Sequence, residues 1–70
     1  MDLPEFRRKF ADRVRALRER RGLRQDEMEE YGVPWKTFQM LEQGQGNPTV
    51  QTLLKVADAF DVTLSELLDF

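Results

Sequence analysis

The sequence contains neither cysteine nor histidine, and Ser65 is its only serine. These absences exclude disulfides, thiol catalysis, Cys/His metal sites, histidine acid–base chemistry and a Ser–His nucleophile. A chain of 70 residues also has little core in which to enclose a sizeable substrate. We therefore expect no enzyme activity, no cofactor and no metal site.

Long apolar runs are missing as well. No run approaches the roughly 18 residues that a membrane span requires, and no signal-peptide pattern opens the chain. We expect a cytoplasmic protein with no membrane partner. Hydrophobic residues make up 40% and charged residues 34% of the chain, which is typical of a globular domain with a heavily charged surface. A single domain over residues 1–70 is expected.

The formal net charge of −2 hides a division of charge along the chain. Residues 1–24 hold nine basic and four acidic side chains, a balance of +5, whereas residues 25–70 hold two basic and nine acidic ones, a balance of −7. A charged run on an amphipathic helix is usually its solvated face, so we assign most of the basic residues to solvent. The acidic residues between 26 and 30 point in diverging directions on a helix, and we assign them to solvent too.

Apolar residues recur with a helical period throughout, and no segment alternates with the period of a strand. The stripe of the first helix consists of Phe6, Phe10, Val14 and Leu17. Thr49 is expected to cap one helix, and Thr63 with Glu66 forms a capping box for another. Asp61 is expected to adopt left-handed geometry between them. The pattern predicts five helices, at about residues 3–21, 25–31, 35–43, 50–60 and 64–69.

Leu17–Met28 (LRERRGLRQDEM) resembles the opening of the Cro/C1-type (XRE family) helix-turn-helix domain. Gly32-Val33, Leu41–Gly44 (LEQG), Asn47–Thr49 (NPT), Leu53–Ala57 (LLKVA) and Val62–Leu67 (VTLSEL) continue its pattern in order. The resemblance covers about residues 10–69. It implies an all-α, five-helix, lambda-repressor-like bundle whose helix-turn-helix places one helix in the major groove.

The sequence departs from the family pattern in its second helix. Seven residues lead from Gln25 to Gly32, where the family usually has eight. The family also prefers a small residue where the second and third helices approach most closely, and that place falls on Met28 or Glu29. We expect a second helix that is one residue shorter. This leaves the fold intact but bears on how the domain docks on DNA.

The resemblance makes residues 35–43 the recognition helix. Phe38 and Leu41 are expected to face the core, which leaves five outward side chains for base contacts, namely Trp35, Lys36, Gln39, Met40 and Gln43. Glutamine bonds bidentately to adenine, lysine to guanine, and apolar side chains touch the thymine methyl group. The alternative for Trp35 is packing beside Tyr31 or anchoring a protein partner.

The resemblance also implies contacts with DNA phosphates from a second set of residues, namely Arg24, Gln25, Thr37, Gln45 and Asn47. For Gln45 and Asn47 the alternative is turn chemistry alone. Arg20 and Arg21, near the end of the first helix, could approach phosphates.

Arg18 and Glu42 match a structural salt bridge that ties the first helix to the recognition helix, so Arg18 is left out of the DNA contacts. A dimer is implied, and the expected interface consists of Leu64, Leu67, Leu68 and Phe70. Leu3 and Phe6 either cover the core or join that interface.

Three functions follow from these patterns. The first is a sequence-specific regulator of transcription, a homodimeric repressor that reads an inverted repeat in double-stranded DNA and is nucleoid-associated while bound. No site for a small-molecule effector is evident. The second is a helix-turn-helix module for protein–protein interaction, antitoxin-like or accessory, with weak or no DNA binding, which a pI of about 5.0 favours. The third, a basic helix on a membrane surface, is disfavoured because its apolar stripe is needed by the core.

Overall fold

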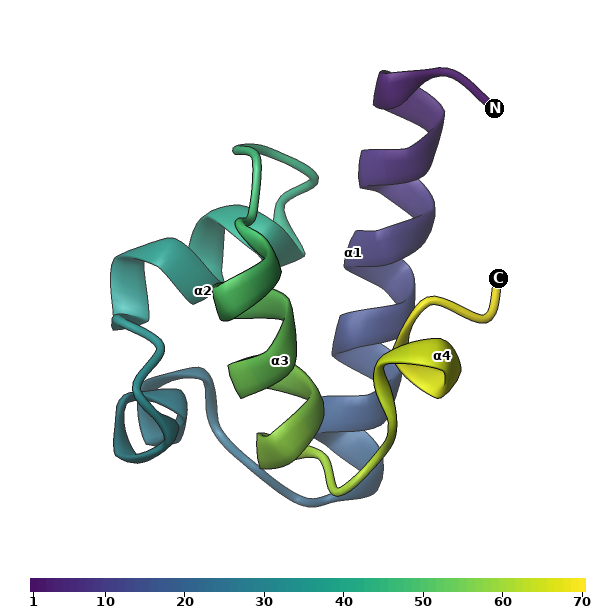
Figure 1. Cartoon of the computed structure of the whole chain (residues 1–70). Helices are drawn as coiled ribbons and strands as arrows, with labels where there is room; N and C mark the ends of the chain where they lie inside the picture. The colour runs from purple at the N-terminus through teal and green to yellow at the C-terminus, as the bar shows by residue number, and fades with distance from the viewer.

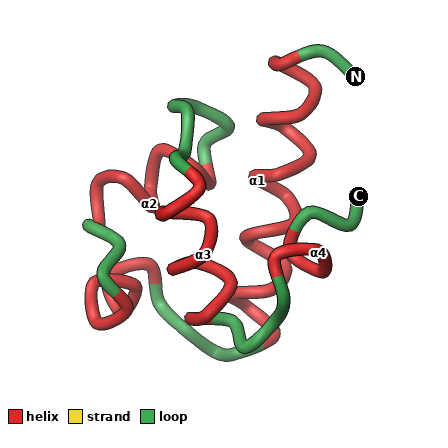
Figure 2. Tube along the Cα trace, in the orientation of Figure 1, coloured by secondary structure: helices red, strands yellow, loops and turns green.

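The structure is a computed structural model that describes residues 1–70 and contains only helices and loops (Figures 1 and 2). In chain order the elements are α1 (Leu3–Arg20), the 3₁₀ helix η1 (Gln25–Tyr31), α2 (Trp35–Glu42), α3 (Val50–Ala59) and α4 (Leu64–Leu67). The predicted all-α architecture of five helices is confirmed.

The long helix α1 runs along one side of the bundle and packs on α2 (Figure 1). Helix α4 packs on α3 and lies against α1, where Arg13 donates to the Glu66 carbonyl. Element η1 packs on both α2 and α3. None of the helices combines the length with the apolar composition needed to cross a membrane.

Three helices begin at side-chain caps. The Asp2 carboxylate accepts the Glu5 N–H at 2.8 Å, and the Thr49 hydroxyl accepts the Thr52 N–H at 3.1 Å. Helix α4 begins at the Thr63–Glu66 capping box. Each cap supplies an acceptor for an N–H group that lacks a partner within the helix. The sequence therefore encodes where these helices begin.

Helix α4 ends at Leu67, two residues before the end of the predicted range. After Leu68 the chain leaves the helix, and the Phe70 ring packs on α1. Its centroid lies 5.4 Å from that of Phe6 and 6.4 Å from that of Phe10. Aromatic rings at this separation attract one another, which favours the early end of the helix.

The shortened second helix of the sequence is the 3₁₀ helix η1. A 3₁₀ helix rises about 2.0 Å per residue, against about 1.5 Å in an α-helix, so seven residues reach as far as a longer α-helical segment. Met28 is fully buried here and Glu29 is exposed. Of the two candidates for the close approach to α2, the structure therefore selects Met28.

The core lies where the five elements meet. Its largest fully buried side chains are Phe38, Met28, Leu67, Val14, Val33 and Val56. They come from all five elements and the turn before α2, so no helix is dispensable to the packing. Glu42 is the one charged residue among the buried ones, at 3% exposure.

The capping box of α4 predicts a dependence of stability on pH. Glu66 Oε1 accepts the Thr63 N–H at 3.0 Å, and Thr63 Oγ1 accepts the Glu66 N–H at 3.1 Å. The hydrogen bonds with Thr63 lower the pKa of the Glu66 carboxyl below its ordinary 4.5, and the bond from the Thr63 backbone N–H has the largest effect. A carboxyl whose pKa is lowered by folding stabilises the fold above its unfolded pKa, and this stability is lost as pH falls through the folded pKa.

We therefore expect Glu66→Gln to unfold at a lower temperature than the wild type at neutral pH, and the difference to shrink at pH values below 4.5. Thermal unfolding followed by circular dichroism, at neutral pH and at a pH below 4.5, measures the difference in Tm between the two proteins. A difference of the same size at both pH values would contradict this assignment.

Candidate nucleic-acid interface

Helix α2 has one buried face and one exposed face. Phe38, Leu41 and Glu42 are buried, at 0%, 4% and 3% exposure. Four of the five predicted base-contacting side chains are exposed, and the fifth, Gln39, is half-buried. The structure thus brings Trp35, Lys36, Gln39, Met40 and Gln43 to the outward side of α2.

Trp35 stands at the first position of α2 and is 41% exposed. Tyr31, the nearest preceding aromatic residue in the sequence, is 38% exposed. All close aromatic ring pairs of the molecule are between phenylalanines. Trp35 is therefore not stacked on Tyr31, and a large part of its ring is open to a partner.

Glu42 links the end of α2 to two other elements. Its Oε2 lies 2.5 Å from Arg18 Nε, and its Oε1 accepts from Arg18 Nη2 at 3.2 Å. Gln25 Nε2, at the start of η1, donates to the same Oε1 at 3.1 Å. The structure brings the expected Arg18–Glu42 pair together, and the hydrogen bond to Glu42 raises the pKa of Arg18.

Two predicted phosphate contacts lie at the start of η1. The Gln25 side chain is fixed by its bond to Glu42, which leaves its second amide hydrogen free to donate. Arg24 is exposed, and its Nε binds Asp26 Oδ1 at 3.0 Å. That hydrogen bond raises the pKa of Arg24, so the guanidinium is charged but already shares its charge with a carboxylate.

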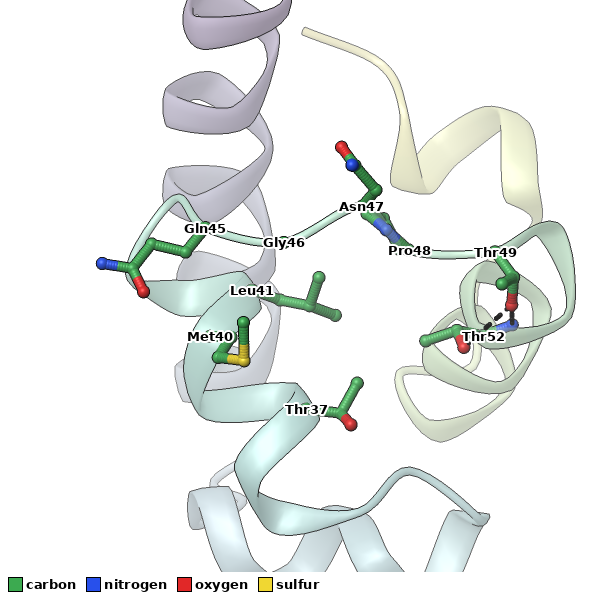
Figure 3. Close-up of a pocket in the computed structure, with 9 residues that line it drawn as sticks. All are labelled: Thr37, Met40, Leu41, Gln45, Gly46, Asn47, Pro48, Thr49 and Thr52. Atoms are coloured by element: carbon green, nitrogen blue, oxygen red, sulfur yellow. Dashed lines mark hydrogen bonds between the residues drawn. The ribbon is translucent and has the colours of Figure 1, made fainter.

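The other predicted phosphate contacts line a pocket of about 280 Å³ between α2 and α3 (Figure 3). Thr37 and Met40 come from α2, Gln45 and Asn47 from the following loop, and Thr52 from α3. In Figure 3 the side chains of Gln45 and Asn47 point away from the pocket. Thr37 is half-buried and points into it.

Sequence reasoning missed two arginines of α1 that contact this region. Arg15 Nη2 donates to the Glu42 carbonyl at 2.7 Å, and Arg7 Nη2 donates to Asn47 Oδ1. The charge pattern of α1 instead predicts that most of its basic residues face solvent. The spacing could have indicated these contacts. Positions 7, 11, 15 and 18 form one stripe of the helix, next to the apolar stripe, so Arg7 and Arg15 share a face with Arg18.

The predicted dimer interface needs a correction. Leu67 is fully buried inside the chain and belongs to its core, so it is unavailable to a second copy. Leu64 and Leu68 are half-buried against the core, whereas Phe70 is 38% exposed. Leu3, in α1, is 53% exposed. The Phe70 ring packs on Phe6 of the same helix.

The comparisons with known proteins agree with this geometry. The sequence model of the helix-turn-helix family matches residues 14–67. The cryptic phage CTXphi transcriptional repressor RstR of Vibrio cholerae serotype O1 is 36% identical over 39 residues. That alignment covers 56% of this chain and 35% of the repressor, so the chain spans about a third of the curated relative it matches. No solved structure matches significantly. The family match over most of the chain, together with the five-helix bundle, shows that the chain belongs to the Cro/C1-type helix-turn-helix (XRE) family.

Proposed function

We propose that this chain is a sequence-specific, double-stranded-DNA-binding regulator of transcription, a dimeric repressor that acts in the cytoplasm and is nucleoid-associated while bound. The observation that carries the proposal is the division of α2 into a buried face and an exposed face rich in base-reading side chains. The relative's description as a transcriptional repressor supports the direction of regulation.

The outward face of α2 carries the chemistry for reading base edges in the major groove. The Gln39 amide suits adenine, which offers an acceptor and a donor side by side, and the Lys36 ammonium suits the two acceptors of guanine. Met40 is 44% exposed, and an apolar side chain at this place fits a thymine methyl group. Gln43 reads bases at the far end of the helix, and Trp35 packs on a base or sugar at its beginning.

Contacts with phosphates set the register of α2 in the groove. We assign them to Arg24 and Gln25 at the start of η1, to Thr37 on α2, and to Gln45 and Asn47 in the loop. These positions lie before, on and after the recognition helix. A helix held at both ends presents the same side chains to the same base pairs each time it binds.

A dimer would place two recognition helices in successive major grooves, about 34 Å apart. We propose an interface made by the exposed parts of Leu64, Leu68 and Phe70, extended by Leu3 and Phe6. Residues from both ends of the chain meet at this surface, because the Phe70 ring packs on Phe6.

A second function, binding of a protein partner, is favoured by the exposed Trp35 and by the acidic balance of residues 25–70. Tryptophan is enriched among residues that dominate protein interfaces. The two functions differ in their dependence on salt. DNA binding falls steeply with rising salt because counterions are released from phosphates, whereas a protein-binding module has no such affinity to lose.

Selection of duplexes from a random pool with the purified chain at moderate salt, read by sequencing, tests the proposal. We expect an enriched inverted repeat whose half-sites lie about one helical turn apart. An enriched single half-site would retain DNA reading and overturn the dimer. A pool without enrichment would overturn DNA reading and leave the protein-binding module.

A further inference from the structure

The first part of α1 lies outside the family match and beside the loop that follows α2. Helix α1 begins at Leu3, whereas the match begins at residue 14. Gly44 lies against this part of α1, because a Cβ atom built there would lie 3.7 Å from the Arg7 carbonyl oxygen and 4.0 Å from Arg8 Cα. In Figure 1 the upper turns of α1 rise to the level of this loop.

Arg7 is held at this loop with most of its hydrogen-bonding capacity unused. Its Nη2 donates to Asn47 Oδ1, which is the only hydrogen bond of its side chain. Its Nε is buried and has no partner, although a guanidinium carries five N–H donors. No carboxylate of the chain forms an ion pair with it. Arg7 is therefore a fixed cation without a counter-ion.

The surface around the recognition helix is short of positive charge. Residues 25–70 carry nine acidic side chains, and Lys36 is the single basic residue of α2. Affinity for DNA depends on phosphate neutralisation. Arg7 supplies a cation from the other end of the sequence, at Asn47, a residue already assigned to the DNA backbone under the proposed function. Arg8 is exposed and lies next to the same loop.

We infer that Arg7 binds a backbone phosphate of DNA beside the α2–α3 loop, with Asn47 orienting its guanidinium and Arg8 adding charge. This inference rests on the proposed function, since it requires that α2 enters the groove. The bond from Nη2 to Asn47 restrains the guanidinium, whose remaining Nη hydrogens can donate to phosphate oxygens in the fork geometry typical of arginine. The first turns of α1 thus extend the DNA-binding surface beyond the helix-turn-helix.

The test compares Arg7→Gln with Lys9→Gln, each of which removes one positive charge from α1. Lys9 lines a hollow with Asp69 and Phe70 rather than the loop. Its exposed pair with Glu5, at 3.8 Å, contributes little to stability. Binding to a labelled duplex of arbitrary sequence, two helical turns long, is measured by fluorescence anisotropy over a series of salt concentrations.

Each phosphate contact contributes about 0.9 to the slope of log K against log salt. We expect Arg7→Gln to reduce the magnitude of this slope by about one contact, and Lys9→Gln to keep the wild-type slope. Arg7→Lys, which retains the charge, is expected to keep a slope close to the wild-type value even where its affinity falls. A Tm for each variant separates loss of the fold from loss of the contact.

The outcomes distinguish failure of the proposed function from failure of the role of Arg7. A wild-type chain that binds no duplex at low salt overturns the proposed function and this inference together. A wild-type chain that binds with salt-dependent affinity, while folded Arg7→Gln keeps the full slope, overturns only the role of Arg7. An equal reduction of the slope in Arg7→Gln and Lys9→Gln overturns it too, since the effect would then be one of net charge.

Discussion

Replacing Glu42 by alanine is expected to lower the free energy of unfolding by about 3–5 kcal/mol, which is typical of breaking a buried ion pair from one side. The Glu42 side chain is 2% exposed and accepts from Arg18 and Gln25. Its removal leaves the Arg18 side chain, itself only 17% exposed, without its counter-ion. At about 0.05–0.15 kcal/mol per residue, so small a domain has little stability to spare.

Thermal and urea unfolding followed by circular dichroism measure this loss. For a domain of this size 1 kcal/mol corresponds to about 4–8 °C, so we expect Tm to fall by more than about 10 °C. Glu29→Ala is the matched control, because it removes an exposed acid from the neighbouring η1. Equal Tm values for Glu42→Ala and Glu29→Ala would show that the buried pair adds no stability.

The second large effect is expected on base reading. Gln39→Ala and Lys36→Ala should each weaken binding to the selected duplex by about 1–3 kcal/mol, or roughly 5- to 150-fold, because a bidentate contact to one base is lost. Each variant should also accept other bases at one position of the half-site. The two variants should differ in the slope of log K against log salt: only Lys36→Ala should change it, since only Lys36 carries a charge.

Repeating the duplex selection with each variant gives the base preference directly, and anisotropy gives the affinity. Gln51→Ala, on the exposed side of α3, is the control and should keep the wild-type preference. If both α2 variants enrich the unchanged repeat with the wild-type affinity, the reading face lies elsewhere on the molecule.

Local features of the fold could be predicted from the sequence because they depend on neighbouring residues. The caps Thr49 and Thr63 act on N–H groups three residues away, and the period of α2 separates Phe38 from Gln39. The Arg18–Glu42 pair came instead from the family resemblance, since no local rule connects residues so far apart.

Other features could not be predicted because they depend on how distant elements pack. The bond between Arg7 and Asn47 joins residues 40 positions apart, and it requires α1 to pass beside the loop after α2. The sequence predicts Leu67 at an interface, whereas the side chain is buried, because a four-residue helix is too short for its period to separate inside from outside. Between Met28 and Glu29, the sequence left two alignments open, and only the winding of η1 decides between them.

That winding has a consequence for comparing relatives. Seven residues at about 2.0 Å each span about 14 Å, whereas eight α-helical residues span about 12 Å. A gap in an alignment at this place therefore does not indicate a recognition helix drawn closer to α1. Because seven residues of η1 span at least as far as eight α-helical residues would, positions of α2 are best compared by counting back from Glu42, the residue that anchors the helix.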